Sequence, residues 1–408
     1  MDRELGGRRA IQRYLGLEWD LVLLLGMVVF VGLGERIGSR FVPKYLESLG
    51  GSFLVIGLYG ALENLLGALW ALPGGVLSDR LGTKRALALF NGIAMLGYAI
   101  VLLVPRWPAV IVASVFFLAW SSISLPATMS LVVSVLPKTK RAMGVSMHSL
   151  IRRVPMALGP VLGGALIGAF GIQRGVRISF AIALLLALVA LLLQQKMVGG
   201  EPKRYEHIDL VGLLRGFHPG LKRLLVSDIL IRFCEQIPYA FVVLWVMDVA
   251  GKSAQAFGWF SAIEMGTAMV IYIPVAHFSD RMERKPFVLA TFVFFTLFPA
   301  VLFFSRTTAA LTGAFVLRGL KEFGEPTRKA MIVDHAAPGL EARTVGAYYL
   351  SRDAVVSLAA LAGGVLWKVG PAWSLWAAFA CGCLGTLYFA RFGRGVAPQG
   401  VSSGPKGR

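Results

Sequence analysis

The chain has 408 residues, of which 56% are hydrophobic and 15% charged, and its mean hydropathy is +0.70. A water-soluble domain cannot bury that much apolar surface, so the composition excludes a soluble globular protein and predicts a membrane protein. The formal net charge is +19. Because Lys and Arg are scattered over short segments between apolar stretches, we expect no nucleic-acid partner.

Apolar stretches of about twenty residues, each long enough to cross a bilayer as a helix, recur along the whole chain. They predict an all-α fold of twelve transmembrane helices, with centres near Val29, Leu65, Ala94, Trp120, Leu158, Leu186, Arg232, Gly266, Phe295, Leu320, Ser357 and Ala380. The longest polar segment, Gln194–Gly220, divides them into two sets of six. We therefore expect an N-terminal bundle over residues 1–194, a cytoplasmic linker over 195–220 and a C-terminal bundle over 221–408 with a disordered tail.

Lys and Arg are concentrated in alternate loops, and the positive-inside rule then places both termini in the cytoplasm. This predicts a multi-pass protein of the inner (plasma) membrane, surrounded by the lipid bilayer and monomeric. Its three cysteines lie in apolar stretches and its five histidines are scattered without ligand spacing. We therefore expect neither a metal nor a cofactor.

A short charged turn, Gly75–Leu87 (GVLSDRLGTKRAL), recurs about two hundred residues later at Ala276–Leu289 (AHFSDRMERKPFVL). Such a repeat predicts two homologous halves, each with the turn in the same place. Gly82 permits a tight reversal of the chain. The basic residues suit a cytoplasmic, anionic membrane surface.

The first copy resembles the G-x-L-a-D-r-x-G-r-k-x-x-l signature of the major facilitator superfamily, and the second copy departs from it at Ala276 and Glu283. The resemblance implies two pseudo-symmetric six-helix bundles that rock against each other during transport. It also implies a cytoplasmic gate motif formed by Gly75, Asp79, Arg80, Gly82, Lys84, Asp280 and Arg281.

The segment that contains Gly159, Pro160, Gly163 and Gly164 resembles the G-P-x-x-G-G motif of antiporters in this superfamily. It implies a branch similar to drug/proton antiporters. The alternative is a plain helix-packing motif, since small residues let helices approach closely. The pair Gly163-Gly164 returns as Gly363-Gly364 in the second half.

Charged residues within membrane spans are costly and usually face a water-filled cavity or a partner. A carboxylate in a low-dielectric cavity can carry a proton near neutral pH. Four glutamates, paired by the repeat, are the candidates for proton coupling: Glu35, Glu63, Glu235 and Glu264. Glu35 is the first choice, with its neighbour Arg36 expected to point elsewhere. The alternative is a permanent ion pair of Glu35, for instance with Arg352.

The candidates for the substrate cavity are Arg36, Arg152, Arg232, Arg318, Glu322, Glu325, Arg352, Asp353, Tyr239 and Trp120. Arg318, Glu322, Glu325 and Lys329 have the spacing of one face of a continuous helix. They are expected to pair along it, as are Lys321 and Glu325. Either this ladder binds substrate near Arg318, or it only neutralises itself.

The sequence carries no P-loop and no catalytic signature, so we expect a transporter and not an enzyme. The leading hypothesis is proton-coupled export of small amphipathic organic solutes by alternating access, with protons and a small-molecule substrate as partners. An organic-anion transporter or a lipid flippase of the same fold remains an alternative. A membrane sensor that binds without moving its ligand is an alternative of another class.

Overall fold

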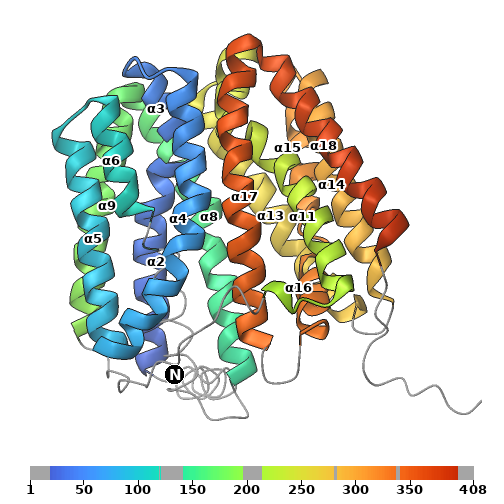
Figure 1. Ribbon diagram of the computed structural model, residues 1–408. Helices are drawn as coiled ribbons and strands as arrows, with labels where there is room; N and C mark the ends of the chain where they lie inside the picture. The colour runs from blue at the N-terminus through green and yellow to red at the C-terminus, as the bar shows by residue number, and fades with distance from the viewer. Residues whose placement is uncertain are drawn as a thin grey trace, which may run out of the picture. The chain divides into compact units, whose positions relative to one another are not determined.

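The computed structural model describes residues 19–118, 120, 141–195, 214–279, 283–336 and 341–393. Every regular element in these ranges is helical (Figure 1). The elements in chain order are α2 (Trp19–Ser39), α3 (Val42–Ser48), α4 (Phe53–Leu81), α5 (Thr83–Leu103), α6 (Trp107–Phe117), α8 (Arg141–Phe170), α9 (Ile172–Gln195), α11 (Pro219–Tyr239), α12 (Val242–Leu244), the π-helical turn η2 (Trp245–Val249), α13 (Ala254–Ser279), α14 (Arg284–Phe304), α15 (Thr308–Leu320), α16 (Glu325–Asp334), α17 (Glu341–Val369) and α18 (Pro371–Phe392).

In the described ranges, seven helices are long and apolar enough to cross a membrane: α4, α5, α8, α9, α14, α17 and α18. Two further helices, Pro219–Tyr239 and Val242–Val249, meet the same criteria when they are counted together as one span. The angle of the bend between them is 46°. Pro238 lies at the bend and removes a backbone donor there. The prediction of an all-α membrane protein is therefore confirmed. The expected fourth span, the linker and the tail fall largely on residues outside the described ranges.

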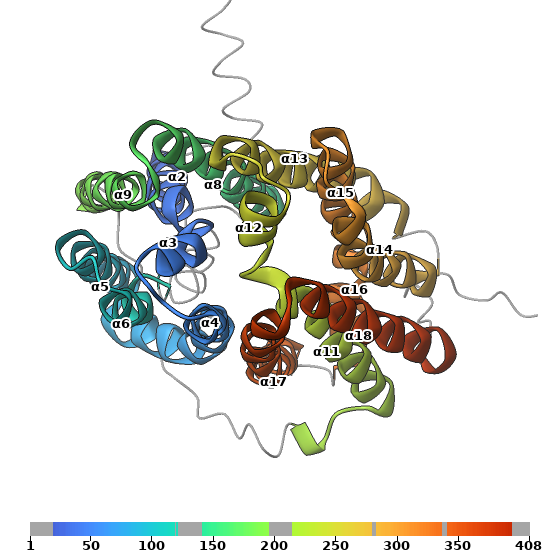
Figure 2. The same cartoon turned by 90° about the horizontal axis from the view of Figure 1, so that it is seen from above.

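Backbone contacts divide the chain into two units. Unit one comprises Met1–His207 and Val246–Ala262, and unit two comprises Ile208–Trp245 and Ile263–Arg408. In unit one, α2 packs against α8 and α9, and α5 packs against α6 and α9 (Figure 2). In unit two, α11 packs against α17 and α18, and α14 packs against α18.

Residues 246–262 belong to unit one because they contact its helices directly. The rings of Phe41 and Phe257 meet edge to face with centroids 5.4 Å apart. Lys44 of α3 donates hydrogen bonds to Glu47, at 2.5 Å, and to Asp248. Burial alone lowers the pKa of Lys44, but these two carboxylates raise it overall above its ordinary value. The ammonium group therefore stays charged and holds this segment in place at neutral pH.

The internal repeat appears as the same helix crossing in both units. In unit one, α8 passes α2 so closely that a Cβ atom on Gly163 would collide with the carbonyl oxygen of Ile37. In unit two, α17 passes α11 in the same way, with Gly363 against the carbonyl oxygen of Ile237. Only glycine allows backbones to approach so closely. The repeat predicted from the sequence is thus a repeat of structure.

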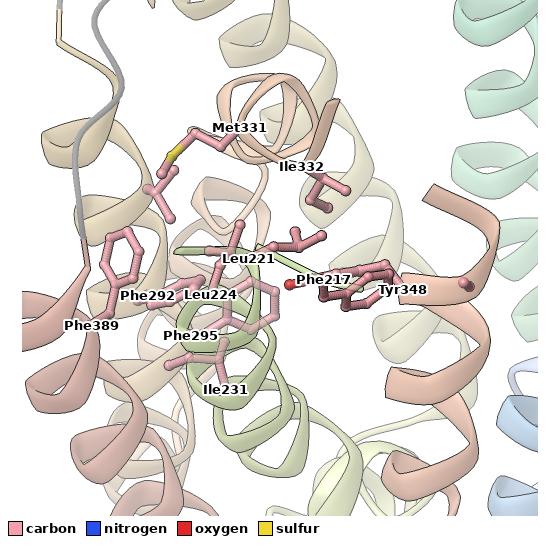
Figure 3. Packing of buried hydrophobic residues seen from close by; sticks show 12 residues of the cluster. Phe217, Leu221, Leu224, Ile231, Phe292, Phe295, Met331, Ile332, Tyr348 and Phe389 are labelled. Carbon is pink, nitrogen blue, oxygen red and sulfur yellow. The ribbon is translucent and has the colours of Figure 1, made fainter. Parts of the chain in front are cut away.

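The core of unit two is a cluster of twelve buried residues from Phe217 and α11, α14, α16, α17 and α18 (Figure 3). Phe292 and Phe389 meet edge to face at 5.1 Å within it. Phe295 also belongs to the cluster, and its ring centroid lies 5.2 Å from the guanidinium of Arg232. The cluster therefore excludes water from one side of the charged groups described below.

The expectation of one continuous helix around Leu320 is wrong. Helix α15 ends at Leu320, and α16 begins at Glu325 after a four-residue turn. Pro326, in the first turn of α16, has no N–H to donate to a preceding helix. The backbone N–H of Gly324 instead donates to Thr291 Oγ1 at 2.5 Å. The charged residues on either side of the turn therefore do not share one helix face.

Candidate functional site

A narrow cavity in unit one brings together the charged candidates of α2 and α8. Its empty volume, open side included, is about 280 Å³. It is lined by Val28, Gly32, Glu35, Arg36, Trp120, Arg152, Pro155 and Met156. Arg36 Nη2 lies 3.5 Å from Glu35 Oε1, so the expectation that Arg36 points elsewhere is wrong. The Cβ atoms of adjacent residues diverge, but the long arginine side chain folds back.

Close packing of α8 on α2 creates this arrangement. A Cβ atom on Gly159 would lie 2.6 Å from Arg36 Cβ, so only glycine lets the helices meet here. The contact brings Arg152 of α8 into the electrostatic field of Arg36 and Glu35. Trp120 and Pro155 supply apolar walls. Among its described lining residues, the cavity thus holds two guanidinium groups and one carboxylate beside apolar side chains.

Unit two holds a connected set of buried and half-buried ion pairs, which we name the ionic chain. Its members come from five helices and one turn. They are Asp228, Arg232 and Glu235 of α11, Glu264 of α13, Arg318 of α15, Lys321 of the turn that follows, Glu325 and Arg328 of α16, and Arg352 and Asp353 of α17. These ten residues are five carboxylates and five cations, so the formal charges within the ionic chain cancel. Buried charges require such pairing, because each one would otherwise lose its hydration without compensation.

One end of the ionic chain is centred on Lys321. Its Nζ lies 2.8 Å from Glu235 Oε1 and 3.1 Å from Glu264 Oε1. Arg318 Nε lies 3.3 Å from the same Glu264 oxygen, and its guanidinium lies over the ring of Phe298 at 4.9 Å and that of Tyr239 at 5.5 Å. Glu235 and Glu264, two of the proton-coupling candidates, are therefore held by cations here.

The other end is centred on Arg328, whose exposed fraction is 1%. Arg328 donates to both oxygens of Glu325, at 2.7 and 2.6 Å, and to Asp228 Oδ2. Asp228 Oδ2 also accepts hydrogen bonds from Tyr348, at 3.1 Å, and from Arg352, at 3.3 Å. Such bidentate and convergent contacts are the strongest that a carboxylate makes with arginine.

Arg232 joins the two ends of the ionic chain. It donates to Glu235 at 2.6 Å and to Glu325 at 3.2 Å. The first pair lies within α11, at the spacing i,i+3, whereas the second connects α11 with α16. The sequence predicted pairs along the helix around Leu320, whereas Lys321 pairs with residues of other helices. The break after Leu320 is the reason, because it turns Lys321 toward α11 and α13.

The remaining candidates are placed as follows. Glu63 lies half-buried in α4, and Glu322 lies in the turn between α15 and α16. Asp353 accepts a hydrogen bond from its neighbour Arg352 at 2.7 Å. Within unit two, Arg352 pairs with Asp228 and Asp353. Sequence reasoning left Asp228, Lys321, Arg328 and Tyr348 out of the site candidates, although it expected Lys321 to pair with Glu325.

In the charged turn, Gly82 has φ 76°, in the left-handed region that favours glycine. Lys84 donates to the carbonyl oxygen of Gln195, at the end of α9, at 2.7 Å. Lys285 of the second copy donates in the same way to Ala390, near the end of α18, at 2.9 Å. Arg80 is exposed, and the side chain of Asp79 lies outside the described residues.

The surroundings of Gly75, and the whole of Asp280 and Arg281, also lie outside the described residues. The gate role of the motif stays a prediction. In both units, however, the lysine of the motif forms a hydrogen bond between the start of one helix and the end of another. Lys84 connects α5 with α9, and Lys285 connects α14 with α18.

We expect Lys84→Ala to lower the stability of unit one by up to about 1 kcal/mol, because a partly exposed hydrogen bond to a helix C-terminus is lost. The measurement is the melting temperature in detergent. Arg85→Ala, which removes the adjacent exposed charge, is the control and should change little. Equal melting of the two variants would show that the bond to Gln195 adds nothing.

No group of three or more His, Cys, Asp or Glu side chains within the described ranges is placed to hold a metal ion. The cavity of unit one and the ionic chain of unit two are therefore the two places where the described residues concentrate chemistry.

Comparison with known proteins identifies the architecture. The model of the Major Facilitator Superfamily matches residues 24–227. The efflux pump azaK of Aspergillus niger is 28% identical over 136 residues, which cover 32% of this chain and 29% of the pump. An uncharacterized MFS-type transporter of Methanocaldococcus jannaschii is 23% identical over 188 residues, which cover 45% of this chain and 48% of the relative. The matches thus span less than half of each curated relative.

Among solved structures, the nucleoside transporter NupG superposes with a TM-score of 0.79 at 12% sequence identity. The superposition covers 91% of this chain and 99% of NupG. At this level of identity the likeness concerns the fold.

Proposed function

Because the chain belongs to the Major Facilitator Superfamily, we propose that it is a proton-coupled secondary transporter that exports small amphipathic organic solutes by alternating access. Its multi-pass helical fold supports membrane transport. The likeness to an efflux pump supports export as the direction. The Gly159–Gly164 motif leads us to expect exchange with protons as the form of coupling.

The observation that carries the proposal is the position of Glu35. Its side chain is 5% exposed and lines a narrow cavity together with Arg36 and Arg152. Glu235, at the same place in the second half, is instead held by Lys321 and Arg232. A carboxylate that is less tightly paired is better suited to exchange a proton during a transport cycle. We therefore keep Glu35 as the proton carrier.

We expect Glu35→Gln to abolish transport driven by a proton gradient while exchange of substrate for substrate survives, because the amide cannot release a proton. The measurement compares gradient-driven flux with counterflow in proteoliposomes, using a solute library to find the transported compound. Glu47→Gln, which removes a carboxylate outside the cavity, is the control and should retain both fluxes.

Three outcomes separate the alternatives. If Glu35 is a structural ion-pair partner, Glu35→Gln should lower the melting temperature and both fluxes together, because it strands a buried cation. Gradient-driven flux that is unchanged in the variant would contradict the role of Glu35. Saturable binding without counterflow of any solute would contradict transport itself and favour a sensor.

A further inference from the structure

Residues 246–262, which we name the strap, pack on unit one, although the chain before and after them belongs to unit two. The strap starts in the π-helical turn η2 and ends within α13. Gly251, which lies between η2 and α13, has φ 63°, in the left-handed region that favours glycine. The strap is therefore entered through irregular backbone, where a few residues can absorb a change of chain direction more easily than the middle of a long helix.

Close backbone contacts define where the strap lies on α8. A Cβ atom on Gly164 of α8 would lie 2.5 Å from the carbonyl oxygen of Ala254 in the strap. Conversely, a Cβ atom on Gly258 of the strap would lie 2.4 Å from the carbonyl oxygen of Pro160 in α8. Each helix thus places a glycine where the other brings a carbonyl group. The two surfaces fit by shape, so the strap has one well-defined position on unit one.

The charged contact of the strap is the ion pair between Asp248 and Lys44 of α3. Lys44 also contacts Glu47 of its own helix, at 2.5 Å. The side chain of Asp248 is 40% exposed. If the strap left unit one, Lys44 would keep Glu47 as its partner and water would hydrate Asp248. Neither charge would be stranded, in contrast to the buried charges of the ionic chain, so this ion pair can open and re-form with little change in free energy.

The internal repeat does not require this ion pair. In the alignment of the two halves that pairs Glu35 with Glu235, Lys44 corresponds to Leu244, which is apolar. Asp248 corresponds to Ser48, which carries no charge. A contact needed to build each bundle is expected in both halves, as the glycine crossings are. The Lys44–Asp248 pair therefore points to a role other than holding a bundle together.

We propose that the strap is a releasable fastening, which separates from unit one and returns in each transport cycle, and that the Lys44–Asp248 pair sets how often it separates. The inference deepens the proposed function and rests on it, since alternating access requires contacts that break and re-form in every cycle. Helix α13 continues unbroken from the strap to Ser279. A movement of unit two is therefore transmitted to the strap through a rigid helix.

The test is hydrogen–deuterium exchange of the purified full chain in detergent, resolved by peptide. In wild type, we expect the amides of the strap to exchange faster than those of α2 and α8. Asp248→Asn should raise the exchange rate of the strap about two- to fivefold, the range that corresponds to loss of a partly exposed ion pair. It should leave exchange in α2 and α8, and the melting temperature, nearly unchanged.

Glu47→Gln is the matched control, because it removes the same charge next to Lys44 but leaves the pair with Asp248 in place. It should keep the exchange rate of the strap. The double variant Lys44→Glu, Asp248→Lys, which exchanges the two charges, should restore slow exchange, whereas Lys44→Glu by itself should not. Unchanged exchange of the strap in Asp248→Asn, failure of the double variant to restore it, or faster exchange of the strap, α2 and α8 together would each overturn the proposal.

A cross-link separates this inference from the proposed function. Lys44→Cys with Asp248→Cys, bridged by a reducible bifunctional thiol reagent, should stop flux in proteoliposomes, and reduction should restore it. Wild type treated with the same reagent controls for the three native cysteines. Flux that continues through the bridged protein would leave transport standing and contradict the strap. Exchange of the strap that depends on Asp248, without flux of any solute, would leave the releasable fastening standing and contradict transport.

Discussion

Replacing Arg328 by Met is expected to cost about 3 kcal/mol of folding free energy, because two buried carboxylates lose their shortest cationic contact and keep only the longer ones with Arg232 and Arg352. Arg328 is 1% exposed and donates to Glu325 and Asp228. Methionine fills much of the volume but cannot neutralise either charge. The measurement is the melting temperature in detergent together with an equilibrium unfolding curve.

Lys329→Met is the matched control for this prediction. Lys329 follows Arg328 in the same helix, but it is exposed. Its loss should change stability by less than about 0.5 kcal/mol, as is usual for surface positions. The double variant Arg328→Met, Glu325→Gln should recover part of the loss, because one of the two carboxylates left with too little positive charge around it is removed together with Arg328. Equal stability of the Arg328 and Lys329 variants would mean that the ionic chain does not stabilise unit two.

Gly363→Ala is expected to be the most damaging single-methyl change in unit two. In an ordinary helix, replacing glycine by alanine gains about 1 kcal/mol, because the unfolded chain loses freedom. At Gly363 the added methyl meets the carbonyl oxygen of Ile237, so α17 and α11 must move apart. Overpacking of this kind typically costs about 1–3 kcal/mol, and here it also disturbs Arg352 of α17, which pairs with Asp228.

Gly346→Ala provides the control on the same helix, since a Cβ atom there would meet no atom within 4 Å. It should leave the melting temperature unchanged or raise it. Gly163→Ala, the corresponding change in unit one, should be as damaging as Gly363→Ala, because it would collide with Ile37 in the same way. A Gly363→Ala variant that melts like Gly346→Ala would contradict the close crossing of α17 and α11.

Several features of this protein were predictable from the sequence because they depend on local composition. Membrane spans follow from the apolarity of consecutive residues, and seven described helices and one bent pair meet that criterion. The repeat follows from residues at matching positions, and Gly163 and Gly363 make the same contact in the two units. The burial of charges such as Glu35 and Arg318 also follows, since both lie within apolar stretches.

Only the tertiary structure decided which of these charges meet. Lys321 pairs with Glu235 and Glu264, which lie 86 and 57 residues away in sequence, and no spacing rule along one helix predicts such partners. The turn after Leu320 was missed because the charged residues on its two sides have the spacing of one helix face, although Pro326 ends the backbone hydrogen bonding. Similarly, Arg36 and Arg152 share a cavity because Gly159 lets α8 approach α2. Burial is a property of each segment, whereas ion pairing depends on the distance and rotation between packed helices, which many side chains set together.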